Sequence, residues 1–576
     1  MKKPGILCLL FMFSFGISFS QETVTFKVLQ TSDIHGNYFP YNFIEDEAMP
    51  GSLSRVYTYV KQEREKYGDR LILLDNGDIL QGQPTAYYYN FVDTTSMHLC
   101  AHIMNYMGYD AATVGNHDIE AGHAVYDRVE RESNFPWMAA NALRNDTNTS
   151  YFASRLLYEA DGVTIGVLGL ITPAIPTWLP ETLWSGMHFA DAKKVAKEYV
   201  PELKEFEGFD VLLGLFHLGY DSRIVAGGIE EGGGENIAIE VPGLDAIMLG
   251  HDHRPVNRMV ENVAGDSVLI INPGANGNYL SEITITLTKK NDKWESSVSG
   301  KLIDINDYEP SEEFIEEFGD EYLRVYGFVR EEIAYNHATM RSREAYFGPS
   351  SFVDLIHRIQ FDLTDADVSF AAPLSFDTDI AEGPIYVSDM FKLYKYENFL
   401  YTMRLTGREI KDFLEHSYKI WTNEMQSPAD HLLDIQPNSR GNGYRFRNSS
   451  YNFDSAAGIS YTVDVTKPAG KKISINPVMA NGKAFDMNAE YLVAINSYRG
   501  NGGGGHLTEG AGIAPDKLNE RIVVSTPVDL RYYMMQWMKK EADIYPEIIT
   551  DWKFVPEEWT TLAAGRDFKL LFGEKN

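Results

Sequence analysis

The chain has 576 residues, with 51 Lys and Arg against 82 Asp and Glu, so its formal net charge is −31. This length is sufficient for two or three domains with hydrophobic cores of their own. Such an acidic surface argues against non-specific binding to a nucleic-acid polymer. It would also repel an anionic substrate, unless cations or local arginines reversed the charge inside a cleft.

The first residues have the pattern of a secretory signal. Two lysines precede an uncharged apolar run at 6–19, and serines near its end offer small residues for cleavage before Gln21. The run is too short to span a membrane, and Cys8 lies too early in it for a lipid anchor. We therefore expect residues 1–20 to be removed on export to a bacterial periplasm, leaving a mature chain without a membrane anchor.

The N-terminal half alternates strand-like apolar runs with helical patterns, which is typical of a layered α/β domain. The runs lie at 24–30, 71–74, 111–114, 163–170, 211–216 and 246–249, with further strands expected at 269–271 and 283–287. We place this domain at 21–310. Residues 311 to about 332 have the pattern of one long acidic helix, and we assign 311–337 as a linker.

A second domain is expected at 338–576. It contains a helix at 351–363, strands at 401–405 and 461–465, and a Gly-rich loop at 500–505. This loop is not a Walker-type phosphate loop, because no Gly-Lys-Ser/Thr sequence follows it.

Side chains that bind metals come directly after five of the strand-like runs. Residues i and i+2 of an extended segment project to the same side, so Asp33 and His35 can meet one ion, as can His251 and His253. The remaining candidates are Asp78, Asn116 and His217. Each segment alone is ordinary turn chemistry or a core histidine, but five together, where the loops of an α/β sheet converge, are poorly explained by chance. Mixed nitrogen and oxygen ligands suit Zn, Mn, Fe or Co better than Mg or Ca.

The order and spacing of these segments resemble the calcineurin-like dinuclear metallophosphoesterases, in their secreted nucleotidase branch. The matching sequences are Asp33-x-His35, Gly77-Asp78, Gly115-Asn116-His117-Asp118, His217 and Gly250-His251-Asp252-His253. The resemblance implies an α/β class of fold. A layered α/β/β/α domain is joined by a helix to a C-terminal α/β nucleotide-binding domain. It also implies two divalent cations, one held by Asp33, His35, Asp78 and His253 and the other by Asp78, Asn116, His217 and His251.

The same resemblance makes His117 the catalytic histidine. In many relatives an aspartate three residues later orients this histidine, and here Glu120, one methylene longer, takes that position. Two cations activate a water molecule for in-line attack on phosphorus. His117 would stabilise or protonate the leaving oxygen, and no phosphoenzyme is required.

Aromatic side chains in the second domain point to a nucleotide substrate. In the nucleotidase branch, one aromatic residue from each of two loops sandwiches the base, and stacking tolerates any base. Tyr498 matches the second of these, and the first is either Tyr451 or Phe453. Arg341 and Arg343 either line the nucleotide cleft or are surface charges.

The segment at 370–375 lacks the arginine of the Asn-Gly-Gly-x-Arg motif that many 5′-nucleotidases carry. This version is similar to the periplasmic 2′,3′-cyclic-nucleotide 2′-phosphodiesterase/3′-nucleotidases, as are the segments at 175–178, 396–398 and 464–468. We therefore expect a monomer that converts 2′,3′-cyclic nucleotides to 3′-nucleotides and these to nucleosides plus phosphate. The alternatives are a 5′-nucleotidase or UDP-sugar hydrolase with the same metals and, from another class, a non-catalytic nucleotide- or metal-binding protein. The complete ligand set argues against the last.

Overall fold

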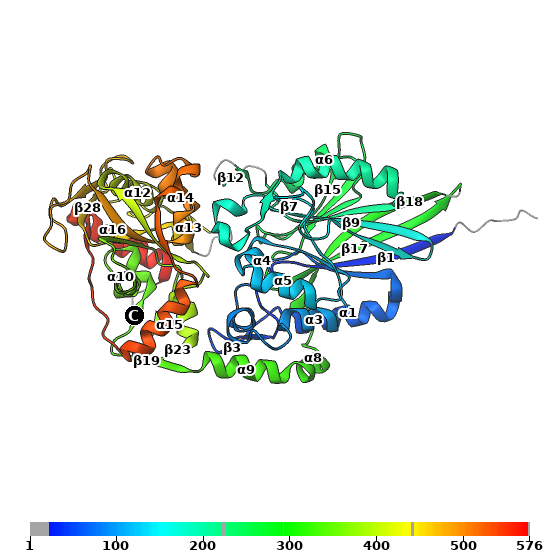
Figure 1. Ribbon diagram of the computed structural model, residues 1–576, viewed down its shortest axis with the longest axis horizontal. Coiled ribbons are helices and arrows are strands. Elements are labelled where there is room, and N and C mark those ends of the chain that lie inside the picture. Colours follow the sequence, from blue (N-terminus) through cyan, green and yellow to red (C-terminus); the bar gives the residue numbers. More distant parts are fainter. Residues whose placement is uncertain (1–21, 222–224, 227–228, 292, 439–442, 574–576) are drawn as a thin grey trace, which may run out of the picture.

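The computed structural model describes residues 22–221, 225–226, 229–291, 293–438 and 443–573, so the expected signal at 1–20 lies outside the described residues. It shows two domains side by side, joined along one edge by the helices α8 (Glu312–Glu317) and α9 (Gly319–Val329) (Figure 1). No helix in these ranges combines the length and the apolar character that crossing a membrane requires.

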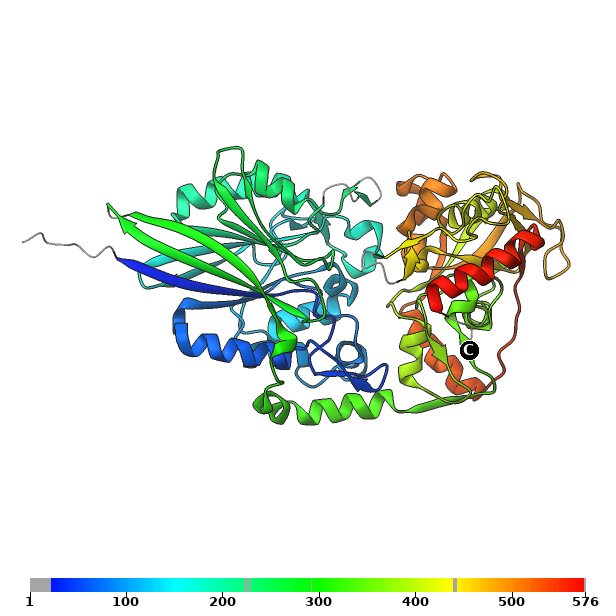
Figure 2. The same cartoon turned by 180° about the vertical axis from the view of Figure 1, so that it is seen from behind.

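Two six-stranded sheets form the centre of the N-terminal domain. The first has the order β18 (Lys293–Asp304), β17 (Tyr279–Lys290), β1 (Thr23–Thr31), β4 (Leu71–Asp75), β5 (Ala111–Thr113) and β6 (Trp137–Met138). The second has the order β15 (Val256–Glu261), β16 (Ser267–Asn272), β14 (Ala246–Leu249), β11 (Val211–His217), β9 (Val163–Ile171) and β8 (Arg155–Ala160). All the strands expected in this half are present. Figure 2 shows the β17–β18 ribbon reaching away from the second domain.

The two sheets pack face to face through a shared apolar layer, to which β1 contributes Val28 and β11 contributes Leu213. Helices cover the outer faces, with α1 (Leu53–Tyr67), α3 (Leu99–Met107) and α5 (His123–Glu132) on the first sheet and α6 (Ala192–Glu202) and α7 (Gly234–Glu240) on the second. The central strands are buried on both faces, which explains their continuous apolar runs. The predicted α/β/β/α layering is confirmed.

The C-terminal domain is built on a five-stranded sheet with the order β27 (Ser455–Ala457), β21 (Val368–Ala371), β30 (Glu490–Asn496), β24 (Leu400–Thr406) and β31 (Ile522–Ser525). On one face lie α10 (Ser351–Leu363) and α15 (Leu530–Glu541), and on the other lies α12 (Gly407–Trp421). The helix expected at 351–363 has those bounds, and the C-terminal α/β domain is confirmed.

The linker differs from the single helix expected at 311–332. The chain leaves helical geometry at Phe318, whose φ of −104° and ψ of 17° separate α8 from α9. The Phe318 ring is fully buried against the rings of His102 and Tyr106, so the N-terminal core fixes the break. The prediction of one long helix was wrong because the acidic pattern continues across this buried anchor.

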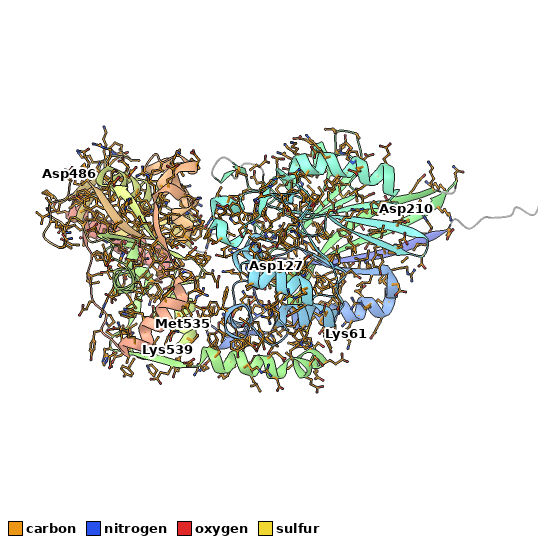
Figure 3. The ribbon with its side chains drawn as sticks, viewed as in Figure 1. Lys61, Asp127, Asp210, Asp486, Met535 and Lys539 are labelled. Atoms are coloured by element: carbon orange, nitrogen blue, oxygen red, sulfur yellow. The ribbon has the colours of Figure 1, made fainter. Side chains whose placement is uncertain are left out.

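A side chain of the N-terminal domain is embedded in the core of the second domain. Tyr87, at the end of α2 (Pro84–Tyr87), is 2% exposed and belongs to the same apolar cluster as α10 and α15. Its ring makes an edge contact with Phe391, at 5.4 Å between centroids, and the Arg531 guanidinium carbon lies 5.2 Å from its centre. Nearby, Lys539 of α15 (labelled in Figure 3) pairs at 2.7 Å with Glu331, two residues after the end of α9.

Candidate metal centre and adjoining pocket

The seven candidate ligands all lie where strands of the two sheets end. The side chains come from the ends of β1 (Asp33, His35), β4 (Asp78), β5 (Asn116), β11 (His217) and β14 (His251, His253). The carboxyl ends of parallel strands meet at one edge of a sheet, and here the edges of two packed sheets meet. The structure therefore gathers residues that are more than 200 positions apart in sequence, since His35 Nε2 lies 3.0 Å from His253 Nε2.

Two groups of possible ligand atoms result, each spanning no more than 4.8 Å. The first contains Asp33, His35 and His253, with His253 Nε2 at 3.3 Å from Asp33 Oδ1. The second contains Asp78, His217 and His251. His217 Nε2 lies 3.2 Å from Asp78 Oδ2 and 3.1 Å from Asn116 Oδ1, which adds the asparagine to the second group.

The tautomers of these histidines fit cation binding. His35 and His217 each place Nδ1 against a backbone carbonyl, Gln81 O at 3.2 Å and Asn76 O at 2.6 Å. A carbonyl only accepts, so in the neutral ring the proton is assigned to Nδ1 and the Nε2 lone pair faces the group. At His217 that lone pair meets two oxygen acceptors, an arrangement that a divalent cation satisfies. Burial lowers the pKa of His35 to about 4, which keeps its ring neutral, as a ligand must be.

The backbone at the ligands has an uncommon conformation. Five of the seven candidates have φ between +50° and +68°, a region that residues other than glycine rarely adopt: Asp33, His35, Asp78, His251 and His253. Such conformations persist only where the surrounding structure enforces them, and they gather at functional sites. This feature supports the proposed ligands independently of their side-chain chemistry.

A buried carboxylate that the sequence analysis named in its motif, but to which it assigned no role, holds these turns together. Asp118 accepts hydrogen bonds from the backbone N–H groups of Asp78, Ile79, Leu80 and Gly115, at 2.8–3.0 Å. The loops after β4 and β5 are thus fixed to each other by protein contacts alone. The carboxylate of Asp78 in turn accepts from the His117 N–H at 2.8 Å.

His117 lies beside the second group without belonging to either. Its Nδ1 lies 2.5 Å from Glu120 Oε2, and both residues line the adjoining pocket. Burial lowers the pKa of His117, but the charges of Asp78 and Glu120 and the hydrogen bond to Glu120 outweigh it and raise the pKa to about 10. These carboxylate neighbours favour the protonated ring, which is the form that a proton donor requires.

A cavity of about 390 Å³ connects this histidine to the second domain. The N-terminal domain contributes Asn116, His117, Glu120, Trp178, Leu179, Glu231 and His251, and the C-terminal domain contributes Leu374, Tyr396, Asn398, Tyr451, Asn496 and Tyr498. The volume and the mixed aromatic and polar lining suit a small organic ligand. No Lys or Arg lies among the described residues of this lining.

The structure separates the alternatives left open for the aromatic pair. Tyr451 and Tyr498 both line the cavity, with ring centroids 6.4 Å apart and ring planes at 83°. Phe453 is fully buried in the core, stacked on Trp421 at 5.4 Å, so it cannot reach a ligand in the cavity. A base held on both faces between parallel rings would require one of the two tyrosines to rotate.

Arg341 and Arg343 do not lie in this cavity. Arg343 pairs with Asp377 at 2.5 Å and with Asp379 at 3.0 Å, and Arg341 lies 3.5 Å from Asp379. Of the two interpretations left open, the structure supports surface ion pairs. Acidic neighbours already occupy both guanidinium groups, so the structure does not support the expectation that these arginines bind substrate.

Arg499 ties the two tyrosine-bearing loops together, a role that sequence reasoning missed. The side chain is 1% exposed and pairs with buried Asp454 at 2.8 Å. It donates to Tyr451 O at 2.6 Å and to Gly503 O at 2.9 Å. An arginine next to an aromatic residue was visible in the sequence, but its buried partners were not. By contrast, the segments at 175–178 and 396–398 were noted from the sequence, and Trp178, Tyr396 and Asn398 line the cavity.

Two family descriptions match the chain. Residues 26–255 match the calcineurin-like phosphoesterases, and residues 325–509 match the C-terminal domain of 5′-nucleotidases. Both domains of the expected architecture are therefore present, in the expected order.

Individual relatives and structures share this arrangement. The chain is 27% identical over 602 residues to the trifunctional nucleotide phosphoesterase protein YfkN of Bacillus subtilis, covering 94% of this chain but 39% of that longer protein. It is 25% identical to a 2′,3′-cyclic-nucleotide 2′-phosphodiesterase/3′-nucleotidase of Salmonella typhimurium, covering 94% and 90% of the two chains. Among solved structures, a 5′-nucleotidase precursor from Thermus thermophilus has the same fold, with a TM-score of 0.61 at 19% identity and with 92% and 99% of the chains covered.

Proposed function

We propose that this chain, a calcineurin-like metallophosphoesterase with a 5′-nucleotidase C-terminal domain, hydrolyses 2′,3′-cyclic nucleotides and 3′-nucleotides. The observation that carries the proposal is the shared cavity. It joins His117 and the second ligand group to two tyrosines of the other domain. Stacking groups and phosphate chemistry thus face a single space, which suits a ligand with a base at one end and a phosphoester at the other.

The ligand groups would hold two divalent cations. Asp33, His35, Asp78 and His253 would bind one, and Asp78, Asn116, His217 and His251 the other. When bound, such cations supply Lewis-acid activation of water and of phosphoryl oxygens. Glu120 would accept a hydrogen bond from the Nδ1–H of His117, which leaves the Nε2–H to donate a proton to the leaving oxygen.

The proposed preference for 2′,3′-cyclic nucleotides and 3′-nucleotides has support in the cavity and among the relatives. The described lining carries no Lys or Arg that would hold a second phosphate beyond the cations. Leu374, from the segment that lacks the arginine of many 5′-nucleotidases, is part of that lining. The Salmonella relative has this activity in its name. Export to the periplasm through residues 1–20 and a monomeric state belong to the same proposal.

A substrate comparison tests the proposal directly. Phosphate release would be measured for 2′,3′-cyclic AMP, 3′-AMP, 5′-AMP and UDP-glucose with cation-free protein resupplied with Mn, Co, Zn or Mg. We expect the first two substrates to give the highest kcat/KM. Preference for 5′-AMP or UDP-glucose would assign the chain to the alternative ester classes, and no hydrolysis with any cation would contradict an enzyme.

The role of the tyrosines is tested in the same assay. Stacking contributes roughly 1–3 kcal/mol per base, so Tyr498→Ala should lower kcat/KM for 3′-AMP roughly 5- to 150-fold. The base-free ester bis-p-nitrophenyl phosphate should be cleaved at nearly the wild-type rate, because it needs only the cations and His117. Tyr451→Ala should behave likewise. Equal losses on both substrates would make these tyrosines structural.

A further inference from the structure

Glu231 connects the second ligand group to the substrate cavity. It follows the short strand β13 (Ile229–Glu230), which pairs with β12 (Val225–Ala226), and its Oε1 lies 2.9 Å from Nε2 of His251. The His251 side chain is 10% exposed and that of Glu231 is 22% exposed. In Figure 1, β12 stands at the side of the N-terminal domain that faces α13 (Ser497–Gly500), the helix carrying Tyr498.

The contact determines which nitrogen of His251 can bind a cation. A carboxylate only accepts, so the hydrogen bond places the proton of the neutral ring on Nε2. Nδ1 then carries the lone pair, and this atom is buried without a hydrogen-bond partner in the structure. An orphaned imidazole lone pair in a group with Asp78 and His217 has the chemistry of a cation ligand.

We propose that Glu231 is a positioning residue, which holds His251 in the tautomer and orientation that present Nδ1 to the second cation. His35 and His217 are held instead by backbone carbonyls, Gln81 O and Asn76 O. His251 therefore differs from these two in depending on a side chain from a separate segment. The inference rests on the proposed function only in assuming that Asp78, Asn116, His217 and His251 hold a divalent cation.

The position of Glu231 gives this contact a second consequence. The residue lines the substrate cavity and also a neighbouring cavity of about 650 Å³, whose lining includes Tyr498 and the glycines 502–505. A carboxylate facing an anionic substrate would repel it. The hydrogen bond from the His251 N–H partly neutralises the Glu231 carboxylate. The same side chain therefore orients a cation ligand and repels the substrate less.

Cobalt titration of the full-length mature protein tests the proposal without relying on turnover. After chelation, Co²⁺ would be added in steps and followed by calorimetry and by its visible absorption. The wild type should take up two equivalents. Loss of an outer hydrogen-bond partner typically weakens metal affinity 10–100-fold, so Glu231→Ala should weaken one of the two sites by about that factor and alter its absorption band. Glu231→Gln, which keeps an acceptor oxygen, should fall between.

Glu230→Ala is the matched control, because it removes the adjacent carboxylate at the end of β13, and Glu230 does not line the cavity. It should bind both equivalents as the wild type does. Circular dichroism confirms folding, and Glu231→Asp serves as a second variant if the alanine protein is unstable. Two unchanged sites in folded Glu231→Ala would overturn the proposal. A wild type that binds fewer than two equivalents would instead contradict the metal centre on which the proposed function depends.

Discussion

His117 and Glu120 are close enough to act as one unit, and neither belongs to the two ligand groups. His117→Ala should keep both cations but lower kcat on the order of 10²–10⁴-fold, the usual contribution of a general acid or base. Glu120→Gln should produce a smaller loss in the same direction, because the ring remains and loses only its charged partner. Elemental analysis beside steady-state kinetics checks both variants. A protein lacking one metal after His117→Ala would make this histidine a ligand.

For individual residues, the sequence predicted the chemical role of a side chain better than its location in the fold. Side-chain type and strand-end location were sufficient to propose the ligands. They could not distinguish Tyr451 from Phe453, which lie two residues apart, because the choice depends on where the chain enters the core. Phe453 follows the short 3₁₀ turn Ser450–Asn452 and turns inward onto Trp421. The left-handed backbone of ligands such as Asp33 and His251 was also unpredictable, because it is imposed by contacts distant in sequence.

The turns after β4 and β5 approach each other so closely that neither Gly77 nor Gly115 has room for a Cβ. A Cβ placed on Gly115 would lie 2.2 Å from Asp78 Oδ1 and 2.5 Å from Asp78 N. Gly115→Ala should therefore displace Asp78, reduce cation binding and lower the free energy of unfolding by about 1–3 kcal/mol, as overpacking does. Thermal unfolding and metal analysis measure the two effects.

A second glycine offers the matched control. A Cβ on Gly327, inside α9, would meet nothing within 4 Å. Gly327→Ala should leave cation content and activity unchanged and raise the free energy of unfolding by roughly 0.5–1 kcal/mol, since glycine weakens a helix interior. If Gly115→Ala retained full cation content, the close approach would not matter for the centre.

Helices and strands were predictable where the apolar residues follow a single pattern along the whole element. The central strands and α10 came from apolar runs and helical spacing, because burial on both faces or on one face leaves a clear pattern. The break in the linker was not predictable, because exposed acidic residues lie on both sides of Phe318 and the sequence pattern does not change there. A single aromatic side chain in a distant core outweighed a local helical preference, as tertiary contacts often do.

At the scale of the whole molecule, Tyr87 supplies a buried contact between the two domains. Removing a large buried aromatic side chain typically costs about 3–5 kcal/mol, so Tyr87→Ala should lower stability by about that amount. The lost contacts with Phe391 and Arg531 belong to the second domain, so its unfolding should separate from that of the first. Differential scanning calorimetry of Tyr87→Ala should show two separate transitions. The wild type should show a single transition, or two that lie closer together in temperature.

A nearby tyrosine provides the comparison. Tyr532 lies on the same helix as Arg531 but is 42% exposed, so Tyr532→Ala should leave the calorimetric profile almost unchanged. If both variants unfolded alike, Tyr87 would not couple the domains.

The burial of Tyr87 in the second domain also limits how these two domains can be exchanged between related proteins. A C-terminal fragment cut within the linker would have a cavity lined by Phe391 and Arg531, because the side chain that fills this cavity belongs to the N-terminal part of the chain. Chimeras that exchange substrate-recognition domains between relatives should therefore transfer the segment around Pro84–Tyr87 together with the C-terminal domain. The part of the chain that must be transferred to change substrate choice is then discontinuous in sequence, because it includes residues on both sides of the helical linker.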